Sequence, residues 1–446
     1  MSASGSRPLG PLALAAMLVA SQYGLGFLLG TAEQAVQWGA AGSLYPVSLV
    51  VGMGLLLLLG RFYWREVEQI WTLLGDRYGE VLRRLVGLMS WLAFVGVAAA
   101  QVAAGAAILQ TVALPWWLGA GGLALTFALL SLLPLERASV VIRGLLVTNA
   151  VVLLLVLTRL GGWGAYWRSP LDFSMGLSVF GGNGQGIGLA VASALAVSVD
   201  MKCHQFVVKA RNLQSLYGGL AIAMVALWLL AFLPSTVALA AMEGGILPAE
   251  VPGAQAIPYL LAWAGGGLDH PLAWGAIAIA ALPAIGLGSN VLRAQAKALV
   301  DLKLLPSTGR WRFGLALLNS ALALVVAARG GAIVSTMTEF YTAYVVVVVV
   351  PFALLLIERR FSIALAPQTV TAAAIATAIG SLAALVTLQL HPQSAWCWSS
   401  PELTIALTGL AIAPIGLGVS RLLAHPGLPP QRMVSRWWRL LRLAQR

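Results

Sequence analysis

Long apolar stretches separated by short polar connections occupy nearly the whole chain. A helix needs about 20 mostly apolar residues to cross a bilayer. Twelve stretches follow this pattern, at residues 10–38, 42–61, 82–110, 115–134, 139–159, 186–208, 213–240, 271–298, 312–328, 332–357, 368–390 and 403–424. The pattern predicts an all-α polytopic membrane protein with about 12 transmembrane helices.

The connections between these stretches alternate in charge. If the N-terminus lies inside, the inner connections and the C-terminal tail hold most of the lysines and arginines, and the outer connections hold only Arg159, Arg168 and Arg329. Most acids outside the spans fall on the outer side, namely Asp172, Glu243, Glu250, Asp269 and Glu402. Because inner loops of membrane proteins are enriched in lysine and arginine, we expect both termini to be cytoplasmic. We expect the location to be a bacterial plasma (inner) membrane.

The composition leaves little room for a soluble domain. Of 446 residues, 60% are hydrophobic and 9% are charged, whereas soluble domains have about 25% charged residues. The N-terminal sequence MSASGSRPLG leads directly into an apolar run that is too long for the core of a signal peptide, so no cleavable signal is expected. The net charge of +12 belongs to loops and tail, and no nucleic-acid partner is expected.

Several kinds of chemistry lack the residues that they need. Cys203 and Cys397 fall on opposite faces of the predicted topology, so no disulfide is expected, and the four histidines are scattered rather than spaced as metal ligands. The sequence has no Gly-Lys-Ser/Thr phosphate loop that would indicate ATP use. No connection gathers His, Asp and Glu. An enzyme is therefore not indicated, and no cofactor is expected beyond a coupling ion, either sodium or a proton.

The C-terminal tail at residues 425–446 has a pattern of its own. Its sequence RMVSRWWRLLRLAQR places Trp437, Trp438 and leucines among arginines at helical spacing. Basic amphipathic helices of this kind lie on anionic membrane surfaces. We therefore expect the tail to bind the anionic inner leaflet of the lipid bilayer rather than nucleic acid.

The first span contains Gly24, Gly26 and Gly30 within seven residues. Each glycine costs about 1 kcal/mol relative to alanine in a helix interior. Unwound backbone at membrane depth is tolerated only where protein buries it or a water-filled cavity meets it. The glycines therefore mark either close packing between helices or a broken helix at a binding site.

The sixth span offers a counterpart to the first. It follows the glycine-rich sequence GGNGQGIG and carries Ser193, Ser198 and Asp200. Spans one and six begin two sets of five helices with opposite orientation, and interrupted segments at corresponding places of two such halves are typical of secondary transporters. The predicted units are two inverted repeats and two further helices, at residues 1–160, 161–366 and 367–424.

Four short motifs stand out along the chain, namely GLGFLLGTAEQAVQWG in the first span, WTLLGDRYG at residues 71–79, SVDMKCHQFVVKARN at residues 198–212 and RAQAKALVDL at residues 293–302. Together they resemble motifs of the sodium:solute symporters, whose fold has two inverted repeats of five helices. The first motif resembles the family's broken first core helix, and the second resembles its inner-loop signature. The sequence SVDMKCHQFVVKARN at residues 198–212 is similar to its sixth-helix pattern, although Phe206 replaces the family's arginine. RAQAKALVDL at residues 293–302 resembles the end of the eighth core helix.

The resemblance implies a sodium site between core helices one and eight. The matching positions on the first helix are Ala20 and Tyr23, whose backbone carbonyls would bind the ion. On the eighth helix, an ungapped match places Ile285 where the family has a hydroxyl, whereas a gap of one turn brings Ser289 and Asn290 there. Sodium coupling, proton coupling and exchange all stay open.

Three acids in the spans are candidate functional groups, because an ionisable residue in a membrane is costly and is a functional hypothesis by default. Glu33, on the predicted outer half of span one, suits proton coupling or is an acid wetted from outside. Asp200 binds solute or has a structural role at the bend of span six, with Lys202 as an ion-pair partner. Glu339 in span ten is a candidate for solute binding, whereas the tyrosines that follow it are typical of an aromatic belt.

Arg293 in span eight is a candidate for ion coupling. A fixed cation near a vacant sodium site would mimic the ion and allow sodium-independent transport. The alternative is a side chain that snorkels to the inner surface, and this alternative is favoured for Arg143, which lies nearer the end of its span.

Uncharged polar residues complete the expected solute site. Gln101, Ser193 and Thr342 could line the cavity, although hydrogen bonds between helices are the commoner role of such residues. We expect solute to bind near Tyr23, Gln101, Ser198 and the polar face of span ten.

These features predict a secondary transporter that moves a small organic solute by alternating access. The bundle with spans one and six would rock against a scaffold of spans three, four, eight and nine. The alternative is a transport-inactive membrane sensor or scaffold that binds a ligand without moving it. The tail is too short for an output domain, which counts against a self-contained sensor.

Overall fold

The computed structural model describes residues 8–66, 69–132, 135–181, 184–304, 309–362 and 364–424. Within these ranges the chain is helical apart from turns and one isolated β-bridge between Leu9 and Ala210. The predicted all-α class is therefore confirmed. The amphipathic tail expected at residues 425–446 lies outside the described residues.

The helices follow one another along the described chain with short connections. The α-helices are α1 (Pro11–Gln22), α2 (Leu25–Trp38), α3 (Leu44–Glu66), α4 (Ile70–Tyr78), α5 (Glu80–Gln110), α6 (Trp116–Ser131), α7 (Leu135–Arg159), α8 (Trp163–Gly176), α9 (Gln185–Val199), α10 (Met201–Val207), α11 (Leu213–Ala231), α12 (Leu233–Glu243), α13 (Ala256–Ala264), α14 (Pro271–Asp301), α15 (Gly309–Ala327), α16 (Ile333–Phe361), α17 (Pro367–Leu390) and α18 (Pro401–Ala424). Four short 3-10 helices lie between them, η1 (Gly39–Ser43), η2 (Leu177–Phe180), η3 (Gly253–Gln255) and η4 (Pro392–Ser394).

Each predicted span contains one or two of these helices. Among the described residues, eight stretches are long and apolar enough to cross a membrane, or nine if the strongly bent pair Val147–Arg159 and Trp163–Phe180 is one span. Helices α1, α6 and α15 are apolar but shorter. The structure thus confirms a polytopic membrane protein whose spans include short and broken helices.

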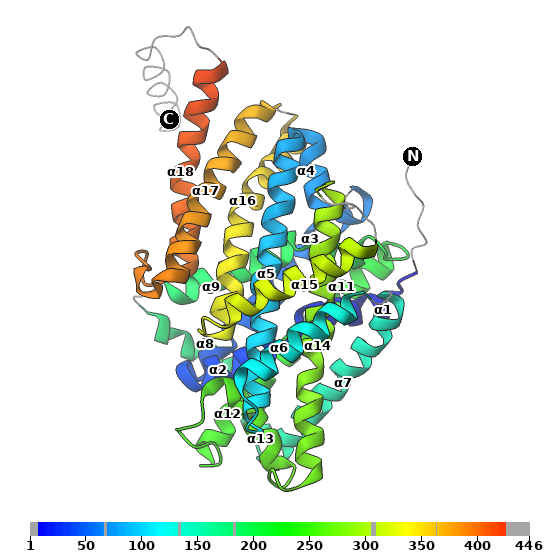
Figure 1. Cartoon of the computed structure of the whole chain (residues 1–446), viewed down its shortest axis with the longest axis vertical. Helices are drawn as coiled ribbons and strands as arrows, with labels where there is room; N and C mark the ends of the chain where they lie inside the picture. The colour runs from blue at the N-terminus through cyan, green and yellow to red at the C-terminus, as the bar shows by residue number, and fades with distance from the viewer. Residues whose placement is uncertain are drawn as a thin grey trace.

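Helix α5 forms the central column of the molecule (Figure 1) and packs against α14, α15 and α16. Its glycines allow close approach, since a Cβ placed on Gly96 would lie 2.5 Å from the Cβ of Phe340 on α16. Helices in lipid associate through such van der Waals contact between small residues, because lipid tails leave little hydrophobic force between them. The small residues of this span therefore allow a dense core around α5.

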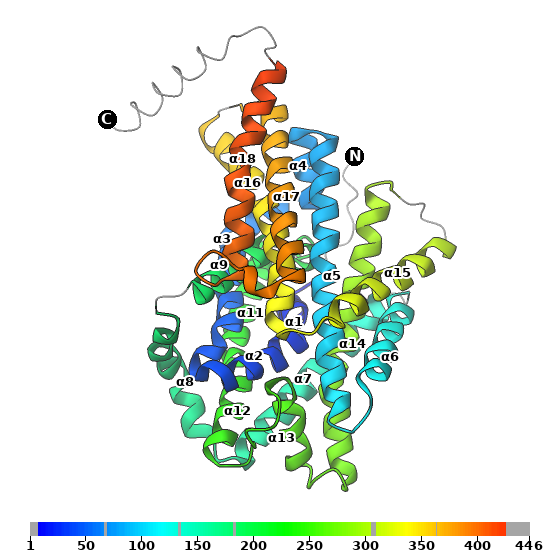
Figure 2. The ribbon, with the colours of Figure 1, turned by 60° about the vertical axis from the view of Figure 1, so that its left-hand side comes forward.

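Helices α17 and α18 form a separate pair, seen beside α16 in Figure 2. Their backbones touch, and a Cβ on Gly380 would lie 2.8 Å from the carbonyl oxygen of Thr408. The pair contacts the rest of the described chain chiefly through α16. The two helices predicted after the repeats are thus peripheral to the bundle that holds the interrupted spans.

Two predicted spans are interrupted where the sequence indicated. Tyr23 and Gly24 separate α1 from α2, and Asp200 alone separates α9 from α10. Because α1 contacts α10, both interruptions lie in the same part of the molecule.

Candidate functional site

The glycines of the first span have two different roles. Gly24 has an extended backbone, with φ −108° and ψ −171°, and a Cβ there would lie 3.0 Å from the Gln101 Oε1 and closer still to a leucine methyl on α14. The amide of Leu25 donates to the same Oε1 at 2.9 Å. A Cβ on Gly30 would instead lie 2.5 Å from a methyl of Val334 on α16. Gly24 therefore lies where the helix is interrupted, whereas Gly30 allows α2 to pack closely against α16.

The second break is built around one carboxylate. Asp200 caps α10, because its Oδ1 accepts a hydrogen bond from the amide of Lys202 at 2.7 Å. The Lys202 Nζ lies 3.2 Å from Oδ2, and the Tyr341 hydroxyl donates to Oδ2 at 2.8 Å. The side chains of Asp200 and Lys202 are only 3% and 8% exposed. The predicted pairing of Lys202 with Asp200 is therefore present, and it is buried.

The backbone carbonyls that α9 leaves open at this break are already satisfied. The Ser198 oxygen accepts from the Tyr63 hydroxyl at 2.6 Å and from the His204 Nε2 at 2.9 Å. The Val199 oxygen accepts from the Tyr344 hydroxyl at 2.7 Å. Since a carbonyl only accepts, the His204 proton must lie on Nε2.

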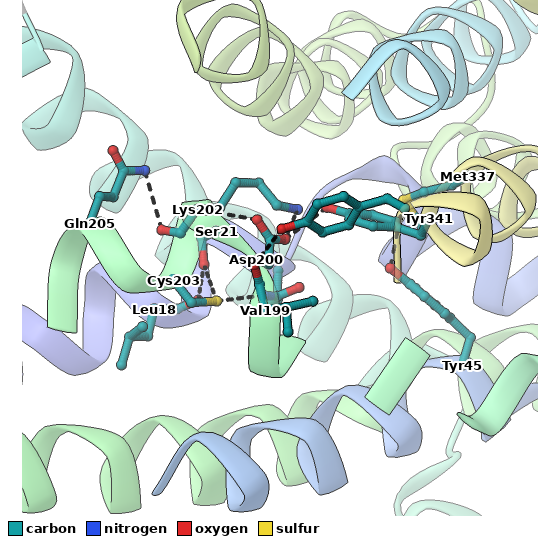
Figure 3. Close-up of polar contacts among 12 residues, drawn as sticks. Leu18, Ser21, Tyr45, Val199, Asp200, Lys202, Cys203, Gln205, Met337 and Tyr341 are labelled. Atoms are coloured by element: carbon teal, nitrogen blue, oxygen red, sulfur yellow. Dashed lines mark hydrogen bonds and ion pairs between the residues drawn. The ribbon is translucent and has the colours of Figure 1, made fainter. Parts of the chain in front are cut away.

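The two breaks meet through α1 and α10 (Figure 3). The Gln22 amide nitrogen donates to the Cys203 sulfur at 3.0 Å, and Tyr341 on α16 reaches the same region through Asp200. We call this group the central cluster; it comprises Gln22, Asp200, Lys202, Cys203 and Tyr341. All five side chains are buried. Sequence reasoning identified Asp200 but missed Gln22 and Cys203, because nothing in a single sequence shows that residues 181 positions apart are in contact.

Three uncharged candidates make local or supporting contacts. Ser198 and Thr342 donate through their hydroxyls to carbonyls of their own helices, as serine and threonine commonly do. The Tyr23 hydroxyl donates to Asn149 on α7 at 2.9 Å, which ties the first break to the neighbouring helix. In this conformation the protons of the three hydroxyls are thus donated to protein partners, and their oxygens can still accept.

Gln101 and Ser193 keep unused hydrogen-bonding capacity. The Gln101 Nε2 and the Ser193 Oγ are buried, and neither has a partner among the described residues. A Cβ on Gly26 would lie 3.8 Å from the Gln101 Nε2, so this donor faces the first turn of α2. Leaving a buried donor unpaired costs about 1–3 kcal/mol. Gln101 thus keeps a buried donor without a partner at the break, and its role in solute binding stays a prediction.

Glu339 lies in a second polar group, away from the central cluster. Its Oε2 accepts from the Gln389 amide at 2.6 Å. Next to it, Thr338 donates to Glu402 on α18 at 2.7 Å, and Glu402 is buried although the sequence indicated an outer loop. Acids on α16 and α18 therefore join the C-terminal pair to the bundle, and Glu402 was the one that sequence reasoning did not single out.

Glu33 caps the first turn of α16. Its Oε2 accepts from the backbone amide of Ile333 at 3.0 Å, across 300 positions of sequence. A carboxylate at a helix N-terminus is stabilised by the helix dipole. The contact gives Glu33 a structural partner, while its predicted role in proton coupling stays a prediction.

The residues expected to bind sodium do not converge as side-chain ligands. Ser289 donates to the carbonyl of Gly286 at 3.1 Å within α14. Ala20 and Ser289 are buried, and Ile285 is partly buried against the core. No group of three or more metal-binding His, Cys, Asp or Glu side chains occurs among the described residues. The Ser289 hydroxyl donates within its own helix but keeps its oxygen lone pairs, and the sodium site expected at Ala20, Tyr23 and Ser289 stays a prediction.

Arg293 contacts the end of another helix. Its guanidinium donates to the carbonyl oxygens of Leu130 and Ser131 in the last turn of α6, at 3.2 and 3.1 Å. It also donates to Asn290 at 2.9 Å. A cation at a helix C-terminus is favourable. Arg293 therefore binds both Asn290 and the end of α6, and the role of these two residues in coupling stays a prediction.

The inner-loop signature WTLLGDRYG holds α4 to the end of α16. Arg77 makes a two-point ion pair with Glu358, with nitrogen–oxygen distances of 2.9 and 2.8 Å, and Tyr78 donates to the same carboxylate at 3.1 Å. Burial and the Glu358 charge raise the pKa of the Tyr78 phenol above its usual value. The Arg-Tyr pair of the signature therefore has a structural function in this chain.

Two cavities lie away from the central cluster. One, of about 160 Å³, is apolar, lies between α9, α16 and α18, and is lined in part by Thr342 and Glu402. The other, of about 50 Å³, lies between η1, α8 and α12 and is lined in part by Asp172 and Glu243. Neither of these two cavities is lined by a member of the central cluster, whose five side chains are buried in this conformation.

Comparison with known proteins places the fold. A Na⁺-coupled sialic acid symporter, solved in a substrate-bound outward-open state, superposes with a TM-score of 0.65 over 92% of this chain and 90% of that chain, at 13% sequence identity. The manganese transporter of Eremococcus coleocola gives a TM-score of 0.48 at 13% identity, covering 95% of this chain and 90% of that chain. No protein-family model and no curated protein sequence matches. The chain therefore shares the fold of this sodium-coupled symporter, as the resemblance implied.

Proposed function

We propose that the protein is a secondary transporter that moves a small organic solute across a bacterial inner membrane by alternating access. The observation that carries this proposal is the convergence of two broken helices on the buried central cluster. Backbone groups within a membrane must be satisfied internally, and broken helices that meet midway are typical of transporter solute sites. The fold shared with a sodium-coupled symporter supports the same function.

In this proposal the solute site comprises the central cluster together with Gln101, Ser193, Ser198 and Tyr23. Residues 1–160 and 161–366 form the two inverted repeats, and residues 367–424 form the peripheral pair. The charge pattern of the connections supports cytoplasmic termini, with the basic tail on the anionic inner leaflet.

We infer that transport proceeds without a sodium ion between α1 and α14. The symporter neighbour is coupled to Na⁺, but in this chain the Arg293 guanidinium donates to the Asn290 side chain, so a fixed cation lies beside the expected sodium ligands. A solute gradient or a proton is the driving force to be tested.

The test is counterflow in liposomes. A thermal-shift screen of small solutes against the purified protein, in sodium and in potassium chloride, first identifies a stabilising ligand. We expect preloaded unlabelled ligand to drive uptake of labelled ligand equally in both salts. A ligand that binds but is never exchanged would contradict transport and favour the sensor, and exchange only in sodium would contradict the sodium-independent mechanism.

A further inference from the structure

The Asp200–Lys202 pair joins two residues of one break rather than two helices. Asp200 and Lys202 are two positions apart, so their attraction fastens no distant elements together. Desolvating both charges costs more than a buried pair usually returns. An ionisable pair kept at such a place in a membrane protein therefore points to function rather than to stability.

We propose that Asp200 and Lys202 form a split binding site for a small zwitterion, and that the two halves bind each other when no solute is present. When the site opens, Asp200 receives the ammonium group of the solute and Lys202 receives its acid group. This inference rests on the proposed transport function and names the chemical class of its solute.

Charge balance selects this class of solute. The closed pair is neutral, and removing one partner from a buried pair leaves the other charge uncompensated. A simple cation bound at Asp200 would strand the Lys202 ammonium, and a simple anion bound at Lys202 would strand the carboxylate. A zwitterion compensates both charges at once, so it can replace the internal pair without leaving a net charge in the membrane.

The neighbours of Asp200 suit an ammonium group. The Tyr341 hydroxyl keeps its hydrogen bond to Oδ2 when Lys202 leaves, and the Lys202 Nζ already lies 5.2 Å from the centre of the Tyr341 ring. An ammonium at that place is attracted by the ring face. The present position of Lys202 therefore shows where a solute ammonium would sit.

A flexible side chain lies beside a second donor. The Met337 sulfur accepts from the Tyr45 hydroxyl at 3.7 Å, and its methyl would lie 3.2 Å from a Cβ on Gly26. Methionine repacks easily. The Gln101 Nε2, which has no partner among the described residues, would lie 3.8 Å from the same Cβ, so it can donate to the acid group of a solute near Gly26.

A metal cation is the competing occupant of Asp200. Such an ion needs several oxygen ligands, but the carbonyls of Ser198 and Val199 beside it are already bonded to protein side chains. An ammonium group needs fewer and more directional acceptors. The available oxygens therefore favour an ammonium over a metal ion.

The experiment removes one charged side chain of the pair at a time and then adds a small ion of the same charge. Lys202→Ala leaves the carboxylate without a cation, and Asp200→Ser leaves the ammonium without an anion while keeping a residue that can cap α10. The Tm of each purified variant is measured in detergent at constant ionic strength, against ethylammonium chloride, potassium acetate, sodium chloride and potassium chloride. We expect ethylammonium to raise the Tm of Lys202→Ala, and acetate to raise that of Asp200→Ser, each to saturation.

The crossed combinations are the matched controls. Acetate should leave Lys202→Ala unchanged, ethylammonium should leave Asp200→Ser unchanged, and the double variant should respond to neither probe. Rescue of only one variant, rescue of neither, or equal rescue of Lys202→Ala by sodium overturns the split site. If a variant does not survive purification alone, its yield of monodisperse protein extracted with and without the probe gives the same comparison.

These measurements are independent of transport. Failed rescue with successful counterflow removes the zwitterion site and leaves the transporter. Successful rescue with no counterflow of any stabilising ligand keeps the binding site and removes the transport function.

Discussion

Two ion pairs in this structure differ in their burial and in the distance along the chain between their partners. The Asp200–Lys202 pair is buried and lies within one break. The Arg77–Glu358 pair has an arginine side chain that is 32% exposed, and it joins α4 to the end of α16 across 281 positions of sequence.

The difference between the two pairs separates stability from function. Arg77 binds Glu358 at two points, and Tyr78 and the Leu365 amide add further donors, so this carboxylate fastens several segments together. The central pair fastens only its own break and Tyr341. The Arg77–Glu358 pair therefore stabilises the contact between α4 and α16. We attribute the Asp200–Lys202 pair instead to the binding of a solute that can replace it.

The largest effect is expected for Lys202→Met. It leaves Asp200 buried without its cation and should cost about 3–5 kcal/mol of unfolding free energy. The double variant Asp200→Asn/Lys202→Met should recover most of this loss, because no charge remains and asparagine still caps α10. Unfolding by SDS titration measures both, and a double variant as unstable as the single one would show that charge is not the cause.

A smaller loss is expected for Glu358→Gln. The substitution weakens several charge-assisted hydrogen bonds at a partly solvated pair and should cost about 2 kcal/mol. Arg77→Ala should have a similar effect, and the double variant should be little worse than either, because both remove the same interaction. If the losses of the two single variants add up fully in the double variant, Arg77 and Glu358 do not stabilise the contact between α4 and α16 through one shared interaction.

Tyr341→Phe should cost about 1.5 kcal/mol, because it removes a hydrogen bond to a charged acceptor. The matched control is Tyr344→Phe, which removes a hydrogen bond to the neutral carbonyl of Val199 and should cost about 1 kcal/mol. In the Asp200→Asn background, the extra cost of Tyr341→Phe should shrink to the level of the control. An unchanged difference would show that the charge of Asp200 does not govern this contact.

No measurable change in Tm is expected for Arg84→Ala. Arg84 pairs with Glu80 within α5, and both side chains are more than half exposed. Exposed pairs of this kind contribute little, and salt screens them. A clear loss of Tm would mean that the exposure of an ion pair does not predict its contribution to stability in this protein. The contrast between the Asp200–Lys202 and Arg77–Glu358 pairs would then have no basis.

The sequence predicted the helices and the two breaks well, because both leave local signals. Apolar length predicts a span, and Gly24 and Asp200 interrupt one at the residue where the structure does. The sequence also placed Asp200 and Lys202 at the bend, since the two are neighbours along the chain.

Contacts between distant segments were beyond a single sequence. Glu33 contacts the first turn of α16, and the buried Glu402 accepts a hydrogen bond from Thr338. Both contacts depend on which helices pack together, and the amino-acid pattern does not show which helices do so. Gln22 and Cys203 gave no signal either, because each is an ordinary residue until α1 and α10 come together. The signature residues Arg77 and Tyr78 were visible, but their partner Glu358 was not.

The central claim is that the cluster between the breaks opens to water during a transport cycle, and Cys203 tests it without a known solute. Cys203 is completely buried in the central cluster. The experiment uses Cys397→Ser protein in liposomes and follows its reaction with a membrane-impermeant, cationic methanethiosulfonate by intact mass. The control moves the single cysteine to the buried scaffold position Ala323 on α15. We predict that Cys203 becomes fully modified under native conditions while the scaffold cysteine stays unmodified; equal protection of both, with full labelling after denaturation, would contradict the account.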